Sequence, residues 1–313
     1  MNTVPGRTAA CDAWRANGVA SQTRGSGIAT VVPVRWLAAL VLLVATACAS
    51  SAVALTPAAS SASVPLAFPA TASQGALVIG RVPAGSVVRL GERTLRVTPY
   101  GSVVFGIGRD ASGPVALEVR TPDGRVQPVR IAVSPRDWPL ERIDGVPPAT
   151  VDPPPAIARR IRDEQARVAA VRALDDARAD FAQRFVMPVE GRISGRFGRA
   201  RSYNGRQGAP HSGMDIAAPA GTAIRAPAAG IVTFADPTLY LTGGTVVLDH
   251  GHGVSSNFLH LSRIDVRVGQ RLAPGEVLGA VGATGRATGP HLHWGMNWFD
   301  VRVDPQLVLD RPG

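Results

Sequence analysis

Apolar and polar residues alternate along the chain with a period that changes from region to region. Residues 76–135 hold short runs such as SVVRL and VALEVRT, separated by turn-forming breaks such as PAG, PYG and PDG. Alternation at every second residue is typical of strands, because successive side chains of a strand point to opposite faces. A series of such short strands predicts a small β-sandwich over residues 76–135.

A proline-rich stretch separates this region from a helical pattern. Residues 136–156 end in VPPATVDPPPA, which predicts a stiff, extended connector. Residues 157–186 contain no proline or glycine, and their apolar residues recur at intervals of three, four or seven. This pattern predicts an amphipathic helix roughly 45 Å long. We expect a spacer helix that packs on its own domains, with a dimer-forming or partner-binding helix as the alternative.

Residues 187–313 return to strand-like runs that are rich in glycine and valine. The stretches GTAIRAPAAGIVTFA, GGTVVLDHGHGVSSNFLHLS and VRVGQRLAPGEVLGAVGAT each predict strands joined by tight turns. The expected fold is therefore mainly β. It comprises a small N-terminal β-sandwich, a long linking helix and a C-terminal β domain.

The first 54 residues predict a leader for export. Residues 36–49 read WLAALVLLVATACA after a basic residue, and SSAVA ends in the A-x-A pattern of a secretory cleavage site near Ala54. The apolar run is short for a membrane-spanning helix. We therefore interpret residues 1–54 as a signal peptide, with a retained membrane leader or a lipid anchor on Cys48 as alternatives. Residues 55–75 predict a flexible Ala/Ser/Pro-rich linker, and the protein is expected in the periplasm or cell envelope.

The charge balance narrows the class of partner. The formal net charge is +10, and all 33 basic residues are arginine. The arginines form no dense run, and no helix-turn-helix, zinc-finger or RNP motif is present, so nucleic acid is not an expected partner. A basic protein is attracted to anionic polymers such as the bacterial wall. The two cysteines, Cys11 and Cys48, lie in the leader, so any metal is expected to be held by histidine, aspartate or glutamate.

All six histidines lie in the last third of the chain, which indicates a local use of imidazole. His291 and His293 are two residues apart and therefore point to the same face of a strand. His211 and Asp215 are four residues apart in PHSGMD. Imidazole and carboxylate are zinc ligands, and a set of two histidines and one aspartate leaves the fourth tetrahedral position open, as a catalytic site requires. The predicted cofactor is Zn2+.

Two further features near this region have structural interpretations. His250 and His252, in DHGHG, lie at a glycine-rich junction between strand and turn, and we expect them to be structural or exposed to solvent. A metal site that uses them is the rival assignment. The glycines at 279, 282, 285 and 289 lead into a strand, so we expect them to let the backbone pass close to the cleft rather than to bind phosphate.

Three motifs in order, HSGMD, NFLHLS and GATGRATGPHLHW, resemble the lysostaphin-like (LytM-type) zinc metallopeptidases, which cleave peptidoglycan peptides. The family pattern is H-x-x-x-D, then a histidine before leucine, then H-x-H. The likeness covers residues 187–310, and the segments before them are more loosely similar to exported Gram-negative forms. The resemblance implies a mainly antiparallel β fold with a groove across a sheet. Phe258 departs from it, because tyrosine is frequent before the central histidine.

Carried over residue by residue, the resemblance implies that His211, Asp215 and His293 are the zinc ligands. It also implies that His260 and His291 are catalytic histidines. Zinc lowers the pKa of its bound water toward about 7. One histidine then takes a proton from that water, and a protonated imidazole helps to stabilise the oxyanion. Which of the two histidines is the base stays open.

The expected function is an exported zinc metalloendopeptidase that hydrolyses the peptide cross-links of peptidoglycan. The alternative is a non-catalytic protein that binds the wall or activates another cell-wall hydrolase. The complete ligand set favours the enzyme, since an open three-ligand site implies chemistry. A carbohydrate or cofactor binder, based on the sandwich alone, is a third interpretation and predicts no metal. We also expect the segments before residue 187 to restrict access to the site. A regulatory protein partner is expected as well.

Overall fold

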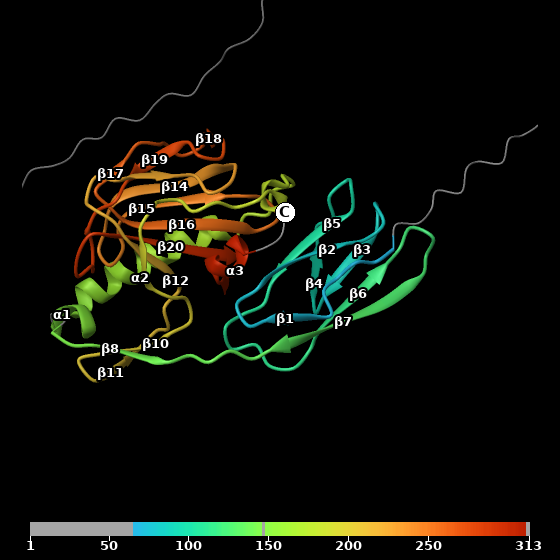
Figure 1. Ribbon diagram of the computed structural model, residues 1–313, viewed down its shortest axis with the longest axis horizontal. Coiled ribbons are helices and arrows are strands. Elements are labelled where there is room, and N and C mark those ends of the chain that lie inside the picture. Colours follow the sequence, from blue (N-terminus) through green and yellow to red (C-terminus); the bar gives the residue numbers. More distant parts are fainter. Residues whose placement is uncertain (1–64, 146–147, 311–313) are drawn as a thin grey trace, which may run out of the picture. The chain divides into compact units, whose positions relative to one another are not determined.

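The computed structural model describes residues 65–145 and 148–310. The predicted signal peptide, both cysteines and residues 55–64 of the predicted linker lie outside these described residues. Within the described ranges the fold is mainly β, as predicted (Figure 1). No helix among them is long and apolar enough to cross a membrane.

The N-terminal strands form two sheets. β2 and β5 pair with each other, and the remaining five strands follow the order β1-β7-β6-β3-β4. Buried residues such as Val88, Val103 and Ile131 belong to an apolar core that continues into the C-terminal domain. The strands are β1 (Thr71–Ser73), β2 (Leu77–Arg81), β3 (Val87–Leu90), β4 (Arg93–Leu95), β5 (Ser102–Gly106), β6 (Val115–Arg120) and β7 (Val126–Ser134).

The first strand lies inside the stretch predicted to be a flexible linker. β1 pairs in parallel with the end of β7, so that Thr71 is opposite Ala132 and Ser73 is opposite Ser134. An edge strand leaves backbone N–H and C=O groups without partners. Pairing with β1 gives hydrogen-bond partners to the backbone groups at the end of β7. The stabilisation from these hydrogen bonds outweighs the linker-like composition of residues 71–73.

The stretch 136–156 differs from the stiff, extended connector that its prolines predict. It contains β8 (Leu140–Ile143) and α1 (Pro148–Val151). β8 pairs in parallel with β10 (Ala200–Tyr203), which is joined to β11 (Arg206–Gly208) in a hairpin. Trp138 also packs edge-on against Phe197, with ring centroids 5.9 Å apart. Strand pairing and this aromatic contact hold the connector against the C-terminal domain.

The linking helix is shorter than predicted, and the prediction is wrong beyond Arg172. α2 runs from Pro155 to Arg172, and the chain after it forms only a 3-10 turn at Asp180–Ala182. Phe181 and Phe185 fit the helical period but are buried in the core of the C-terminal domain instead. Helical stability comes mostly from packing, and burial of two phenylalanines in a core outweighs the propensity of an exposed helix end.

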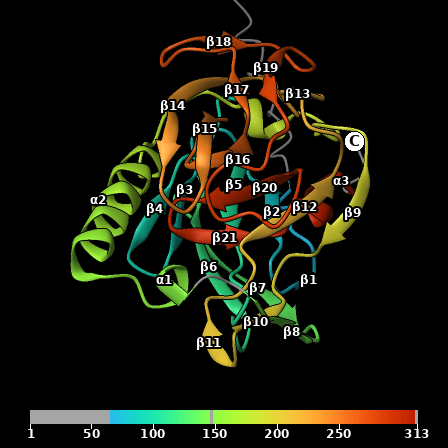
Figure 2. The same cartoon turned by 90° about the vertical axis from the view of Figure 1, so that its left-hand side faces the viewer.

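α2 packs on its own domain, as a spacer helix is expected to do, and lies along β14 and β15 (Figure 2). Glu164 is the buried residue of α2. Glu164 accepts a hydrogen bond of 2.8 Å from the backbone N–H of Tyr240 and one of 2.7 Å from Arg160. The helix also contributes apolar contacts from Val168 and Val171 to a small core of Phe234, Leu239 and Val247.

An antiparallel sheet carries the C-terminal domain. Its order is β18-β14-β15-β16-β20-β12-β9, and β21 pairs with the end of β20. β14, β15, β16 and β20 lie side by side in Figure 1. A second sheet has the order β13-β19-β17. The elements are β9 (Arg192–Gly195), β12 (Gly213–Ala217), β13 (Ala223–Arg225), β14 (Gly230–Leu239), β15 (Gly243–Asp249), β16 (Val254–Leu261), β17 (Arg263–Ile264), β18 (Arg271–Leu272), β19 (Val277–Ala280), β20 (His291–Trp298), β21 (Val301–Val303) and α3 (Pro305–Leu309).

The central strand β20, HLHWGMNW, separates the core from the opposite face of the sheet. Leu292, Trp294 and Met296 are fully buried in the core. Side chains alternate along a strand, so His291 and His293 project from the other face. The candidate site is built on that face.

Replacement of Phe185 with alanine is expected to destabilise the protein by about 3–5 kcal/mol, the cost of removing a large aromatic side chain from a core. Phe185 is only 2% exposed. Urea unfolding measures the change, and Val186→Ala, at a neighbouring residue that is 44% exposed, is the matched control. Equal unfolding midpoints for the two variants would show that residues 173–186 do not belong to the core of this domain.

Candidate metal centre

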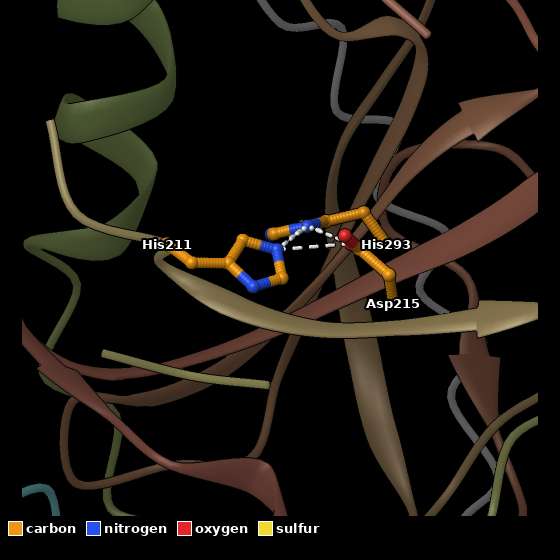
Figure 3. Close-up of side chains that lie close together, drawn as sticks. All are labelled: His211, Asp215 and His293. Carbon is orange, nitrogen blue, oxygen red and sulfur yellow. Dashed lines mark hydrogen bonds and ion pairs between the residues drawn. The ribbon is translucent and has the colours of Figure 1, made fainter. Parts of the chain in front are cut away.

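Two neighbouring strands bring His211, Asp215 and His293 together (Figure 3). His211 lies two residues before the start of β12, Asp215 is the central residue of β12, and His293 lies on β20. In the antiparallel register Asp215 is directly opposite His293. Facing residues on one side of a sheet have neighbouring side chains, so the pairing of β12 with β20 builds this group.

The ligand atoms of the group lie at distances that suit a metal ion. Asp215 Oδ1 is 3.0 Å from His211 Nε2 and 2.7 Å from His293 Nδ1, and the two nitrogens are 3.1 Å apart. Ligands at about 2.0–2.1 Å from a tetrahedral zinc ion are separated by roughly 3.3 Å. The three atoms therefore form one face of a coordination tetrahedron and leave the fourth position open.

A second contact sets the orientation of His211. Its Nδ1 lies 2.9 Å from the backbone carbonyl of Arg196, to which it donates in the tautomer that leaves Nε2 free. Histidine ligands of metals commonly hold their other ring nitrogen in this way. The side chain is thus fixed with Nε2 toward Asp215 and His293.

Glycines provide the space for the group. A Cβ on Gly195 of β9 would lie 2.9 Å from His211 Cε1, and a Cβ on Gly213 would lie 2.8 Å from His293 Nε2. Gly213 is a strand residue of β12 that makes room for His293. The role of Gly195 was missed, because it depends on the pairing of β9 with β12.

His260 and His291 flank the group. His291 Nε2 is 3.9 Å from Asp215 Oδ1, and the rings of His260 and His291 have centroids 4.8 Å apart. His260 Nδ1 lies 2.8 Å from the carbonyl of Thr284, and His291 Nδ1 lies 2.8 Å from the carbonyl of Gly289. When each Nδ1 donates to its carbonyl, both Nε2 atoms are available for proton transfer. His260 also has a φ of 68°, a strained conformation of the kind found at functional sites.

Burial and hydrogen bonding tune the charges of the group. Burial lowers the pKa of His293 to about 4, against the opposing effect of Asp215, and burial lowers the pKa of His260 to about 4 as well. Burial alone would raise the pKa of Asp215, but its interactions with His211 and His293 outweigh that effect and hold the pKa far below its ordinary value. Neutral imidazoles beside an ionised carboxylate are the state that metal binding requires.

Sequence reasoning missed an ion-pair chain behind Asp215. Arg201 of β10 places Nη2 3.3 Å from Asp215 Oδ2 and Nε 3.0 Å from a carboxylate oxygen of Glu141 of β8. The pairing leaves Oδ1 of Asp215 to face the histidines. No sequence signal links Glu141 with Arg201, which are 60 residues apart and meet only through the pairing of β8 with β10.

A cleft runs from this group across the sheet, as the resemblance implies. The sheet contributes Thr245, Asn257 and Leu259, and the loop before β20 contributes residues 286–290. α2 contributes residues to the same cleft, among them Ile161, Glu164, Val168 and Arg172. Gly282 is bridged to His291, and a Cβ there would lie 2.6 Å from the carbonyl of His260, which agrees with the expected close approach of the backbone.

His250 and His252 lie outside both the group and the lining of the cleft. Both are buried, which agrees with the structural interpretation and not with solvent exposure. His250 has ring nitrogens 2.7 Å from the carbonyl of Ala229 and 2.8 Å from Ser256 Oγ. Its partners are therefore structural groups rather than a metal site.

Comparison with known proteins identifies the family. Residues 209–305 match the model of peptidase family M23. A stretch of 113 residues is 39% identical to the peptidoglycan DD-endopeptidase ShyA of Vibrio cholerae, covering 36% of this chain and 26% of ShyA. A stretch of 98 residues is 42% identical to the DD-carboxypeptidase/endopeptidase Mpg of Neisseria meningitidis, covering 31% of this chain and 21% of Mpg. The chain thus spans only about a quarter or less of these relatives.

A solved structure extends the likeness beyond the metal-bearing domain. A crystal structure from Pseudomonas aeruginosa that is assigned to peptidase M23 is 33% identical, with a TM-score of 0.60. The match covers 76% of this chain and 94% of that one. The family and the His-Asp-His group confirm the predicted zinc cofactor and the predicted class of metallopeptidase. The chain belongs to peptidase family M23.

Proposed function

We propose that this protein is a zinc endopeptidase that hydrolyses the peptide cross-links of peptidoglycan. The observation that carries the proposal is the open three-ligand group beside two histidines with free Nε2 atoms, at the floor of a cleft. Two relatives support the substrate class, because ShyA is named a peptidoglycan DD-endopeptidase and Mpg a DD-carboxypeptidase/endopeptidase.

In this proposal His211 Nε2, Asp215 Oδ1 and His293 Nδ1 hold the zinc ion. Bound zinc supplies Lewis acidity, which activates a water molecule and polarises the peptide carbonyl. His260 and His291 exchange protons with the reacting groups through Nε2, one as the base and the other as a donor to the developing oxyanion. Arg201 orients the carboxylate of Asp215 through Oδ2.

Muropeptide dimers test the proposal. The full chain without residues 1–54 is expected to convert purified cross-linked dimers to monomers, with the products identified by mass spectrometry. Intact dimers in the presence of bound zinc would favour the second candidate, a non-catalytic wall-binding protein or an activator of another hydrolase.

The organisation of the whole chain belongs to the same proposal. Residues 1–54 direct export, or retain the protein at the membrane, and the protein acts in the periplasm or cell envelope. Residues 76–135 form a β-sandwich domain, and residues 187–313, together with the preceding Phe181 and Phe185, form the metallopeptidase domain. A regulatory partner acts on the segments before residue 187.

Those segments also restrict access to the site in this proposal, since residues of α2 line the cleft. Glu164→Ala removes the acceptor that holds the helix on the backbone of Tyr240. The variant is expected to digest whole sacculi several-fold faster while hydrolysis of a short soluble peptide changes little. Asp163→Ala, at an exposed position of the same helix, is the control. Identical sacculus digestion by wild type and both variants would contradict a gating role for α2.

A further inference from the structure

The cleft holds two arginines that form no direct ion pair with a carboxylate of the described residues. Arg302 lies on β21 opposite Asn297, and Arg172 is the last residue of α2. Both line the cleft. Within residues 65–145 and 148–310, neither guanidinium lies within 4.0 Å of a carboxylate oxygen. Burial lowers the pKa of Arg302 to about 9, and the nearby charge of Arg172 adds to that effect. Burial also lowers the pKa of Arg172, and the charge of Asp300 opposes that effect. Two desolvated cations near each other are unfavourable unless an anion joins them.

Within the described ranges, some hydrogen-bond donors of Arg172 and of the strands next to Arg302 have no partner. The side chain of Asn297 is fully buried, and its Oδ1 accepts from Asn257 Nδ2 at 2.8 Å and from Arg302 Nη1 at 3.0 Å. Its Nδ2 then has no partner among the described residues, nor have Arg172 Nε and the hydroxyl of Ser255, which faces Asn297 across the strands. Buried donors without acceptors are costly. Of these three, Arg172 Nε belongs to a residue that lines the cleft.

Gly295 places this cluster next to the metal group. The point at which a Cβ on Gly295 would stand is 3.9 Å from Arg302 Nη1 and 3.6 Å from His293 Nε2. Gly295 and His293 are on the same face of β20, one step of the pleat apart. His293 and Arg302 both line the cleft, so a peptide bound at the metal group can reach Arg302.

We propose that Arg302 and Arg172 form a subsite for a free carboxylate of the peptide substrate, close to the bond that is cut, with Arg302 held in place by Oδ1 of Asn297. This inference rests on the proposed function for the identity of the substrate. A planar guanidinium matches a carboxylate in a bidentate pair, and stem peptides of the wall carry free carboxylates. The subsite makes the enzyme selective for peptides that are acidic beside the scissile bond.

A pair of substrates tests the subsite. One is a cross-linked muropeptide dimer with free carboxylates, and the other is the same dimer with those groups converted to carboxamides. Wild type is expected to prefer the acidic dimer by roughly ten- to hundredfold, mostly through KM, given the strength of hydrogen bonds to charged groups. Arg302→Gln is expected to lose this preference. Arg225→Gln, on β13 and outside the cleft, is expected to keep it.

Stability separates a binding role from a structural one. Arg302→Gln removes a desolvated charge from the free protein, so its melting temperature is expected to equal or exceed that of wild type. A lower melting temperature together with an unchanged preference for the acidic dimer would show that Arg302 is only structural, and would overturn the proposal.

A binding measurement keeps the test independent of catalysis. Calorimetry with an uncross-linked stem peptide is expected to show binding to the zinc-loaded wild type, much weaker binding of the carboxamide form, and no such difference in Arg302→Gln. This result without any cleavage would support the subsite while refuting the proposed function. Equal binding of both forms to wild type, or binding of inorganic phosphate in place of the acidic peptide, would overturn the subsite.

Discussion

His293→Ala is expected to leave the purified protein with much less than one zinc ion per chain and with no measurable hydrolysis of muropeptides. His293 Nδ1 lies within 3.1 Å of both other ligand atoms, so its removal opens the third corner of the tetrahedral face. The remaining His211 and Asp215 offer two ligands, fewer than the three protein ligands of catalytic zinc sites. Loss of the metal removes the group that activates water, and with it essentially all of the rate.

Elemental analysis of the dialysed protein measures the zinc, and circular dichroism checks that the variant is folded. Retention of a full equivalent of zinc by folded His293→Ala would contradict the assignment of the ligands. It would direct attention to other residues, including the pair His250 and His252.

His260→Ala is expected to retain its zinc, unlike His293→Ala, while its rate falls by roughly 10²- to 10⁴-fold. That loss is the usual contribution of a positioned acid or base. His260 lies beside the group without being part of it: its Nδ1 is 2.8 Å from the carbonyl of Thr284, and its ring faces that of His291. Its removal therefore leaves the three ligand atoms in place.

Initial rates on a purified dimer, measured with zinc content on the same sample, give the result. Since the expected loss is in kcat, saturating substrate is needed. A variant that keeps both its zinc and its full kcat would show that His260 has no part in proton transfer, and His291→Ala would then become the decisive variant.

The parts of the site that could be predicted from the sequence are those set by short-range geometry. Because β20 is a strand, residues two apart share a face, and the H-x-H spacing places His291 and His293 on the same side. The strand-like runs likewise led to a mainly β fold. The order of the motifs supplied His211, Asp215 and His260 through the resemblance, and the structure brings all five residues together.

The parts that could not be predicted depend on contacts between distant segments. The helix was extended too far because Phe181 and Phe185 fit its period, although the core of the sheet is where they pack. The ion pair of Arg201 with Glu141 requires the parallel pairing of β8 with β10. Arg302 gives no local signal either, since its neighbours Asn297 and Arg172 come from different elements.

Zinc content and activity of the wild-type protein test the central claim most directly. The mature chain is expected to contain about one zinc ion, to digest purified sacculi, to lose digestion on removal of the metal by a chelator and to regain it when zinc is restored. A protein that binds no zinc, or that digests sacculi equally well after complete removal of its metal, would contradict the account.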